Sequence, residues 1–194
     1  IYDNYENSPI NRENIFKFLS ENSNYQKTHI MPLLDYGMIS IPSDAGDNEK
    51  SYRIDILPYI KDGYIKRATY DELKGKIIPD IIEALKSLHT AKFVHRDIKP
   101  ENIYFYKDCV ILADFGTASE ISNTPYNIST TRQGRGTLGY TPPEVWQGYA
   151  VTASDYFSLG CTIATLYKGE HPYQNLLNFD DAGTINNAIN NEGL

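Results

Sequence analysis

The sequence predicts an α+β domain, because stretches with helical spacing occur in the same chain as short paired strands. Apolar side chains recur at helical intervals over 76–90, and a more uniformly apolar run covers 155–167. Between these runs, Ile103–Tyr106 and Cys109–Ala113 are short apolar stretches joined by Lys107-Asp108, which is the pattern of a tight β-hairpin. Helices together with separate small hairpins indicate the α+β class.

The composition fits a globular domain and argues against two kinds of protein. Hydrophobic residues make up 41% of the 194 residues, which is enough for a sizeable core. The formal net charge is −7 and the basic residues form no cluster, so we do not expect nucleic-acid binding. No apolar run has the length of a membrane span and no signal peptide is visible. Cys109 and Cys161 are expected to be buried free thiols, which fits a cytoplasmic protein.

The first part of the chain is expected to form a helix and a pair of strands. Apolar side chains within Asn11–Glu21 have the spacing of a short amphipathic helix. Met31–Ile41 and Ser51–Leu57 are the expected strands, and the polar stretch Pro42–Ser51 is the turn between them. A short helix or turn over Tyr70–Gly75 follows.

The second part is expected to contain helices separated by a long loop. The helix over Lys76–Thr90 would have Pro79 in its first turn, where a missing N–H is tolerated. Thr117–Tyr140 is a polar loop, long enough to be functional or disordered. The remaining expected elements are a short helix over Pro142–Gly148 capped by Thr141, a helix over Asp155–Tyr167 that ends near Gly169, and an amphipathic turn over Ile185–Ile189.

Two short motifs flank the central hairpin and carry the chemistry. Residues 95–102 (HRDIKPEN) precede it, and residues 114–116 (DFG) follow it. Phosphoryl transfer from ATP needs one carboxylate to orient the attacking hydroxyl, an amide and a carboxylate to hold Mg²⁺, and a cation to meet the phosphoryl group. The hairpin is expected to bring the side chains of this set to one end of the small sheet: Asp97, Lys99, Asn102 and Asp114.

This stretch closely resembles the catalytic core of eukaryotic-type Ser/Thr protein kinases, which carry H-R-D-x-x-x-x-N and D-F-G at this spacing. Residues 136–144 (GTLGYTPPE) resemble the segment that closes an activation loop, with P-P-E in place of A-P-E. Residues 155–160 (DYFSLG) resemble the helix whose aspartate braces the catalytic loop, with Phe157 at the usual tryptophan. The resemblance implies a kinase-like fold with a mainly helical C-terminal lobe, small β-hairpins and a partial N-terminal lobe.

The resemblance also implies a division of the chain. Residues 1–57 would be the partial N-terminal lobe, with the regulatory helix and two strands. Residues 58–194 would be the hinge and a C-terminal lobe truncated before its final helices. The family's Gly-rich phosphate loop and strand lysine are not found before the first helix. The intact motifs favour a piece of a longer chain, and the alternative is a protein that lacks these parts.

The resemblance assigns a role to each polar residue of the two motifs. Asp97 is expected to be the catalytic base or to orient the substrate hydroxyl, and Lys99 to stabilise charge on the γ-phosphate. Asn102 completes the catalytic set and would ligate Mg²⁺ together with Asp114. Thr137 would bridge toward the catalytic Asp and Lys, as in Ser/Thr kinases. The plain alternatives are a solvated lysine at Lys99 and local turns at Asn102 and Asp114.

The strand that ends near Leu57 is the expected hinge. Leu57 would lie at the back of the adenine pocket, and the Pro58 carbonyl and the Ile60 N–H would meet the adenine edge. The plain alternative is an ordinary turn after a strand. His95 and Phe115 are expected to be structural. The resemblance thus gives an ATP-binding set of Leu57, Pro58, Ile60, Lys99, Asn102 and Asp114.

Arg96 suggests regulation, because in kinases with this arginine a phosphate on the activation loop pairs with it. An activating kinase or the chain itself would supply that phosphate. Glu13 is the candidate glutamate of the regulatory helix, although the apolar spacing places Arg12 there. The candidate phosphate acceptors are Ser129, Thr130 and Thr131, with Ser122 and Thr124 behind them.

The expected function is transfer of the ATP γ-phosphate to Ser or Thr hydroxyls of a protein substrate with Mg²⁺. A pseudokinase, which keeps the fold as a binding or scaffolding module, is the first alternative. The missing Gly-rich loop and strand lysine favour it, and the complete set of Asp97, Asn102 and Asp114 opposes it. A kinase that acts on small molecules is the second alternative, and Thr137 with the P-P-E segment argues against it.

Overall fold

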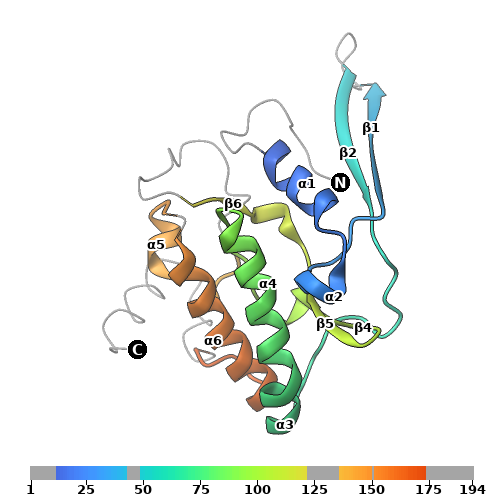
Figure 1. The fold of residues 1–194 in the computed structure, drawn as a ribbon. Helices are drawn as coiled ribbons and strands as arrows, with labels where there is room; N and C mark the ends of the chain where they lie inside the picture. The colour runs from blue at the N-terminus through green and yellow to red at the C-terminus, as the bar shows by residue number, and fades with distance from the viewer. Residues whose placement is uncertain (1–11, 43–48, 122–135, 150, 174–194) are drawn as a thin grey trace.

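The computed structural model describes residues 12–42, 49–121, 136–149 and 151–173 (Figure 1). Two helices, α4 (Ile78–Thr90) and α6 (Thr152–Lys168), run side by side and form the body of the fold. Helix α1 (Arg12–Glu21) lies above them beside the long hairpin of β1 (Asp35–Pro42) and β2 (Glu49–Ile56). Separate two-stranded sheets and packed helices confirm the predicted α+β class.

Helix α1 agrees with the sequence prediction, and its apolar face is buried. Ile15, Phe18 and Leu19 are each less than a tenth exposed. The next helix, α2 (Tyr25–Thr28), is a single turn that the sequence did not predict. A segment of four residues is too short to show the 3.6-residue period on which such predictions depend.

The first strand begins later than predicted. Residues 31–34 are not part of β1, because the Met31 N–H donates to the Leu112 carbonyl at 2.8 Å and the Leu112 N–H donates to the His29 carbonyl at 2.9 Å. The start of the apolar run therefore joins the second hairpin, and only the Leu34 N–H, which donates to the Ile56 carbonyl at 2.9 Å, bonds to the first. From Asp35 onward β1 pairs with β2 in an antiparallel register that places Tyr36 opposite Asp55.

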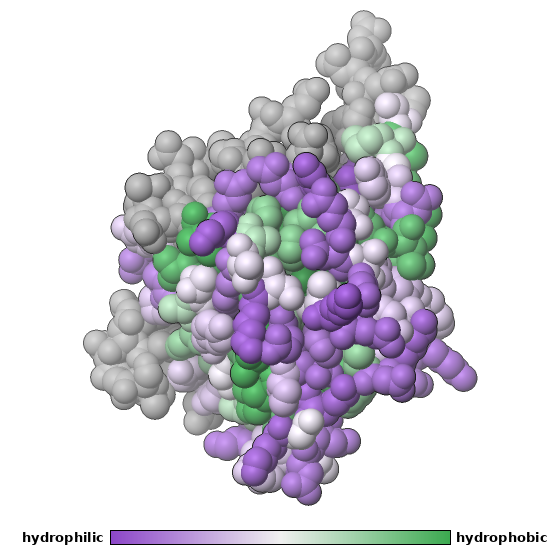
Figure 2. Space-filling view, viewed as in Figure 1, coloured by the Kyte–Doolittle hydropathy of each residue, from purple (hydrophilic) through white to green (hydrophobic). Residues whose placement is uncertain are grey.

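The long hairpin exposes much of its apolar surface. Figure 2 shows hydrophobic side chains gathered on this part of the molecule, at the upper right. Because β1 and β2 form a two-stranded sheet within the described residues, their outer edges carry unpaired backbone groups. The exposed apolar side chains of this hairpin are Tyr36, Met38, Ile39, Ile41, Ile54 and Ile56.

Residues 70–90 form one continuous helical stretch. Helix α3 (Tyr70–Glu72) begins with a capping box, in which Thr69 and Glu72 satisfy each other's backbone N–H groups. A π-helical turn over Leu73–Ile77 joins α3 directly to α4. Pro79 is therefore in the first turn of α4 as predicted, but a helical turn precedes it. The wider π turn tolerates a residue that cannot donate a helical hydrogen bond.

The main core lies where α4 meets α1, α6 and the second hairpin. Burial of one such aliphatic side chain stabilises the fold by about 1.5–3 kcal/mol. Asp80 of α4 also accepts a hydrogen bond from the Val110 N–H at 2.8 Å, which fixes the helix to the hairpin. The fully buried members of this core include Ile15, Ile77, Ile81, Leu85, Leu88, Ile103, Leu112 and Leu166.

The second hairpin confirms the sequence prediction. It consists of β4 (Ile103–Tyr106) and β5 (Cys109–Leu112), and Tyr106 pairs with Cys109 across the predicted two-residue turn. Lys107 in that turn has a φ of +52°, which is the left-handed conformation that such tight turns require.

Helix α5 (Pro143–Trp146) corrects the predicted cap. The sequence predicted Thr141 as the N-cap, but Pro142 occupies that position. The Thr141 hydroxyl donates instead to the Thr137 carbonyl at 2.9 Å, so it closes a turn before the helix. Helix α6 extends the predicted segment at both ends and finishes at Gly169, whose φ of +81° ends the helix.

Both cysteines are buried free thiols, as predicted. Burial raises the pKa of Cys161 to about 11, so this thiol stays protonated at neutral pH. No helix among the described residues is long and apolar enough to cross a membrane. The predicted turn over Ile185–Ile189 lies outside the described residues, and the division into 1–57 and 58–194 stays a prediction.

Candidate active site

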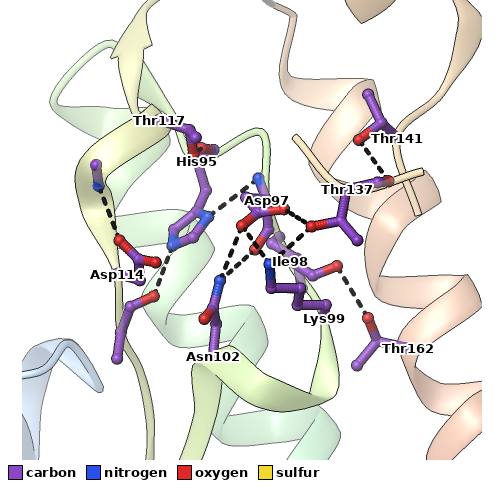
Figure 3. A network of polar contacts seen from close by, with 12 residues as sticks. His95, Asp97, Ile98, Lys99, Asn102, Asp114, Thr117, Thr137, Thr141 and Thr162 are labelled. Carbon is purple, nitrogen blue, oxygen red and sulfur yellow. Dashed lines mark hydrogen bonds and ion pairs between the residues drawn. The ribbon is translucent and has the colours of Figure 1, made fainter. Parts of the chain in front are cut away.

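Two short strands bring the motif loops together. Strand β3 (Phe93–Val94) leads into the 95–102 loop and pairs with β6 (Ser119–Glu120), which follows the 114–116 motif. The β4–β5 hairpin joins the two loops from the other side. The sequence did not predict β3 or β6, because two-residue strands show no periodicity. Figure 3 shows the resulting convergence of both loops with the start of the 136–144 segment.

A single buried carboxylate holds the catalytic loop. Asp155 of α6 is fully buried, and its two oxygens accept hydrogen bonds from the His95 and Arg96 N–H groups, each at 2.9 Å. His89 Nε2 lies 2.8 Å from Asp155 Oδ2 and fixes the carboxylate from α4. Arg96 has a φ of +68°, an uncommon conformation for a residue with a side chain. The contacts to Asp155 hold the backbone in this shape.

His95 connects the two motifs and is structural, as its predicted role requires. Its Nε2 donates to the Ala113 carbonyl at 3.0 Å, and its Nδ1 accepts from the Asp97 N–H at 3.3 Å. These two bonds require the neutral ring, and burial lowers the pKa of His95 accordingly. The ring also meets Phe115 edge-on, with 4.9 Å between the centroids. The histidine thereby fixes Asp97 relative to the residue before Asp114.

Asp97 is the centre of the polar network. The Thr137 hydroxyl donates to Asp97 Oδ1 at 2.5 Å, and Lys99 Nζ lies 2.9 Å from Asp97 Oδ2. Lys99 Nζ also donates to Thr137 Oγ1 at 2.7 Å, so the three side chains form a closed triangle. The Asn102 amide donates to the Asp97 carbonyl at 2.8 Å and to Oδ2 at 3.2 Å. The structure thus brings three predicted residues and Thr137 together.

Asp114 lies beside this network, with an exposed side chain. Its φ of +61° and the hydrogen bond from the Gly116 N–H to Oδ1, at 3.2 Å, shape the turn after β5. The preceding Ala113 donates its N–H to the Asn102 carbonyl at 2.9 Å. In Figure 3 the Asp97 and Asp114 carboxylates lie in the same close view, with His95 between them. The structure therefore places all four predicted polar residues in one region.

The donor set suits a magnesium ion that also binds phosphate. Because Nδ2 of Asn102 donates to Asp97, Oδ1 is the amide atom that remains for a cation. Mg²⁺ prefers a few protein oxygens completed by phosphate and water. Within the described ranges, no group of three or more His, Cys, Asp or Glu side chains could hold a metal alone. Asn102 and Asp114 could therefore hold Mg²⁺ only together with the phosphates of a nucleotide.

The segment after the long loop packs directly on the catalytic loop. Gly136 has a φ of +85°, and a Cβ there would lie 2.4 Å from the Arg96 carbonyl oxygen. No larger residue fits without moving the backbone. The Ser158 hydroxyl of α6 donates to the Tyr140 carbonyl at 2.7 Å, and the Thr162 hydroxyl donates to the Ile98 carbonyl at 3.1 Å. We call residues 136–144 the substrate ledge.

The predicted hinge follows β2 directly. Leu57 is 47% exposed and Pro58 is half-buried, while Ile60 packs against the second hairpin with Met31 and Ile111. The chain then joins the second hairpin, since the Ile65 N–H donates to the Ile103 carbonyl at 2.8 Å. The adenine contacts of Leu57, Pro58 and Ile60 stay a prediction.

The predicted regulatory residues are described only in part. Glu13 lies in α1, but its side chain and that of Arg12 are outside the described residues. Arg96 is buried and its Nε donates to the Thr117 carbonyl at 2.7 Å. The candidate phosphate acceptors Ser122, Thr124, Ser129, Thr130 and Thr131 all lie outside the described residues.

Sequence reasoning missed several residues that support the site. His89 holds Asp155, and the Thr117 hydroxyl donates to the His95 carbonyl at 2.9 Å. Ser158 supports the substrate ledge. His89 lies near the end of an amphipathic helix. A polar residue at such a position is expected to face solvent, so the sequence gives no sign of a buried contact. Its partner is far along the chain, so no local pattern identifies the contact.

A buried histidine lies behind the substrate ledge. The His171 ring meets Tyr140 edge-on, with 4.5 Å between the centroids, and its Nδ1 accepts from the Tyr173 N–H at 3.0 Å. Burial lowers the pKa of His171, and the Gly139 backbone opposes this in part. The folded chain therefore favours the neutral ring.

The His171→Phe substitution is expected to make stability less sensitive to acid. Below about pH 6.5 the unfolded chain protonates this histidine more readily than the folded chain does. The wild type is therefore most stable above that pH, where His171 is neutral in both states. Its free energy of unfolding falls as the pH drops toward the folded-state pKa of His171. Urea denaturation at about pH 7.5 and pH 5.5 measures the loss for both proteins. Equal losses would contradict the prediction.

A braced loop with an H-R-D motif, a D-F-G turn after the neighbouring hairpin, and the 136–144 segment packed on the H-R-D loop define the protein kinase class. The family model "Protein kinase domain" matches residues 48–191, well over half of the chain. The chain belongs to the protein kinase family.

The curated relatives of the chain carry the names of protein kinases. The chain is 34% identical over 130 residues to serine/threonine-protein kinase PknB of Mycolicibacterium smegmatis, covering 60% of this chain and 21% of that protein. It is 32% identical over 151 residues to serine/threonine-protein kinase ppk6 of Schizosaccharomyces pombe, covering 76% and 18%. It is 33% identical over 178 residues to MAP kinase kinase MKK1/SSP32 of Saccharomyces cerevisiae, covering 84% and 32%. The chain thus spans a third or less of these relatives.

Proposed function

We propose that the protein transfers the γ-phosphate of ATP to Ser or Thr hydroxyls of a protein substrate. The observation that carries this proposal is the triangle of Asp97, Lys99 and Thr137. It joins a carboxylate, a cation and a hydroxyl from two segments that lie far apart in the sequence. Similarity to serine/threonine-protein kinases PknB and ppk6 supports the same function.

Asp97 is the residue that receives or orients the acceptor hydroxyl. Its carboxylate is 6% exposed, and Asn102 and Thr137 fix its orientation. A carboxylate held in this way is ready to accept a hydrogen bond from an incoming hydroxyl without first reorganising. The substrate ledge is the surface that would place the Ser or Thr of a peptide beside it.

Lys99 supplies a positive charge that stabilises the phosphoryl group during its transfer. It is half-buried and lies within ion-pair distance of Asp97, so a γ-phosphate beside Asp97 would also meet the ammonium group. Asn102 and Asp114 would hold Mg²⁺, which neutralises charge on the phosphates when bound. Leu57, Pro58 and Ile60 would contact the adenine, and Glu13 would belong to the regulatory helix.

The proposed kinase function includes regulation by phosphorylation. A phosphate on one of the acceptors between 122 and 131 would pair with Arg96 and order that segment. An activating kinase or the protein itself would add it.

The buried thiols Cys109 and Cys161 fit a reducing compartment, and we place the protein in the cytoplasm.

The Asp114→Ala substitution is expected to abolish magnesium-dependent turnover. The site would lose its only predicted carboxylate ligand, and an amide alone binds a hard cation weakly. The measurement is labelled phosphate transfer from ATP by the full-length protein across a range of Mg²⁺ concentrations. The variant should show less than a hundredth of wild-type turnover at about 5 mM Mg²⁺.

Asp108→Ala is the matched control, because Asp108 is an exposed aspartate in the same hairpin at its opposite end. It should behave as the wild type does. An Asp114→Ala protein with an unchanged Mg²⁺ dependence would contradict the metal site. A wild-type protein that binds nucleotide without transferring phosphate would instead support the pseudokinase alternative.

A further inference from the structure

Arg53 connects α1 to the long hairpin, and its guanidinium group is buried. The residue lies on β2 and is 6% exposed. Its Cζ lies 3.6 Å from the centroid of the Phe16 ring on α1 and 4.2 Å from that of the Tyr36 ring on β1. Nε donates to Asp55 Oδ1 at 2.7 Å. One flat cation therefore contacts the helix and both strands.

Stability alone does not explain this arginine. Its Nη2 is buried and has no hydrogen-bond partner among the residues that the structure describes. A buried donor without a partner costs free energy, and an apolar side chain of similar length would avoid that cost. Replacing a buried ion pair with well-packed apolar residues often leaves a protein equally or more stable. The arrangement therefore indicates a requirement beyond folding.

The location of Arg53 suits control of α1. Strand β2 runs from Arg53 to Ile56, and Leu57, the predicted hinge residue, follows it directly. The same helix reaches the catalytic-loop side, because the Asn14 amide donates to Glu120 of β6 at 2.8 Å. Phe18 of α1 also meets Phe93 of β3, with 5.9 Å between the ring centroids. Helix α1 thus lies between the strand leading to the hinge and the strands leading to the catalytic loop.

We propose that Arg53 is a positioning residue for phosphoryl transfer. Its cation, which lies over the Phe16 ring and over the Tyr36 ring, fixes α1 against the strand that leads to the hinge. The proposal rests on the proposed function, in which α1 is the regulatory helix whose placement completes the nucleotide site. Lysine is not equivalent, because a point charge on a flexible stem cannot stack flat on a ring while it also bonds Asp55.

The test compares R53M and R53K in the full-length protein. Because R53M also leaves Asp55 without its partner, we expect some loss of unfolding free energy, together with a kcat at least tenfold lower and a KM for ATP within threefold. Backbone amides of α1 should exchange with deuterium at least tenfold faster. R53K should have a kcat between those of R53M and the wild type. The control is K17M, which changes an exposed residue of α1 that lies 3.9 Å from Glu21 and should alter none of these quantities.

A double variant identifies the route of the effect. If Arg53 acts through Phe16, then R53M/F16L should lower kcat no further than R53M alone. Multiplied effects would overturn this route. A kcat of R53M within twofold of the wild type would overturn the proposal, and so would a parallel fall in kcat and stability with faster exchange throughout the domain.

Failure of the proposal differs from failure of the proposed function. A wild-type protein without transfer activity would reject the function, and hydrogen exchange would still test Arg53. Unchanged exchange of the α1 amides in R53M would then overturn the positioning role.

Discussion

The Asp97→Asn substitution is expected to lower kcat by about 10²–10⁴-fold with nucleotide binding retained. The amide keeps the size of the carboxylate and can still accept from Thr137 or Lys99, so the loop should keep its shape. It cannot take a proton or orient a hydroxyl as strongly as an anion does. The measurement is labelled transfer from γ-labelled ATP by the full-length protein, with calorimetry for nucleotide affinity.

The matched control is Asp108→Asn, which makes the same chemical change at an exposed turn of the neighbouring hairpin. It should transfer phosphate at the wild-type rate. Equal labelling by the wild type and Asp97→Asn would reject the assigned role of Asp97. Loss of nucleotide affinity in Asp97→Asn would show that the loop had moved, and Thr137→Val would then test the same network from its other side.

The Asp155→Ala substitution is expected to lower the free energy of unfolding by about 3–5 kcal/mol. The carboxylate is fully buried and accepts from two backbone N–H groups, those of His95 and Arg96, and contacts His89. Alanine would leave these buried donors without an acceptor. It would also release the left-handed backbone at Arg96, so transfer activity should fall below detection.

Urea denaturation of both proteins at neutral pH measures the loss. Glu170→Ala is the control, since it removes an exposed carboxylate just beyond the end of the same helix and should change stability by less than about 0.5 kcal/mol. A small effect of Asp155→Ala with an intact catalytic loop would contradict the bracing role.

Much of the fold was predictable because several elements have strong local patterns. The second hairpin was predicted to the residue at its turn, and α1, α4 and α6 follow their apolar spacing. The predicted start of β1 was wrong, since Met31 bonds to Leu112 of β5 in a contact that no local pattern encodes. Thr141 was wrong as a cap, because the adjacent Pro142 takes that position.

The sequence predicted the polar residues of the site better than it predicted the buried residues that support them. The spacing of the two motifs and the hairpin between them placed Asp97, Lys99, Asn102 and Asp114 together. The place of Thr137 came from the family resemblance, and its contacts agree. The buried support was not predictable in detail, because His89 and Asp155 meet across 66 residues of sequence. Arg53 was also missed, since a lone arginine in a strand usually signals an exposed face.

Asp155, Ser158 and Thr162 follow one another at helical intervals on α6 and hold the His95 turn, the Tyr140 carbonyl and the Ile98 carbonyl. One face of α6 therefore supports both the loop that carries Asp97, the proposed proton acceptor, and the 136–144 segment. Local melting of that helix face would release both in a single event. On heating, the protein is expected to lose turnover and substrate discrimination at the same temperature, without an intermediate that reacts slowly but still selects its target.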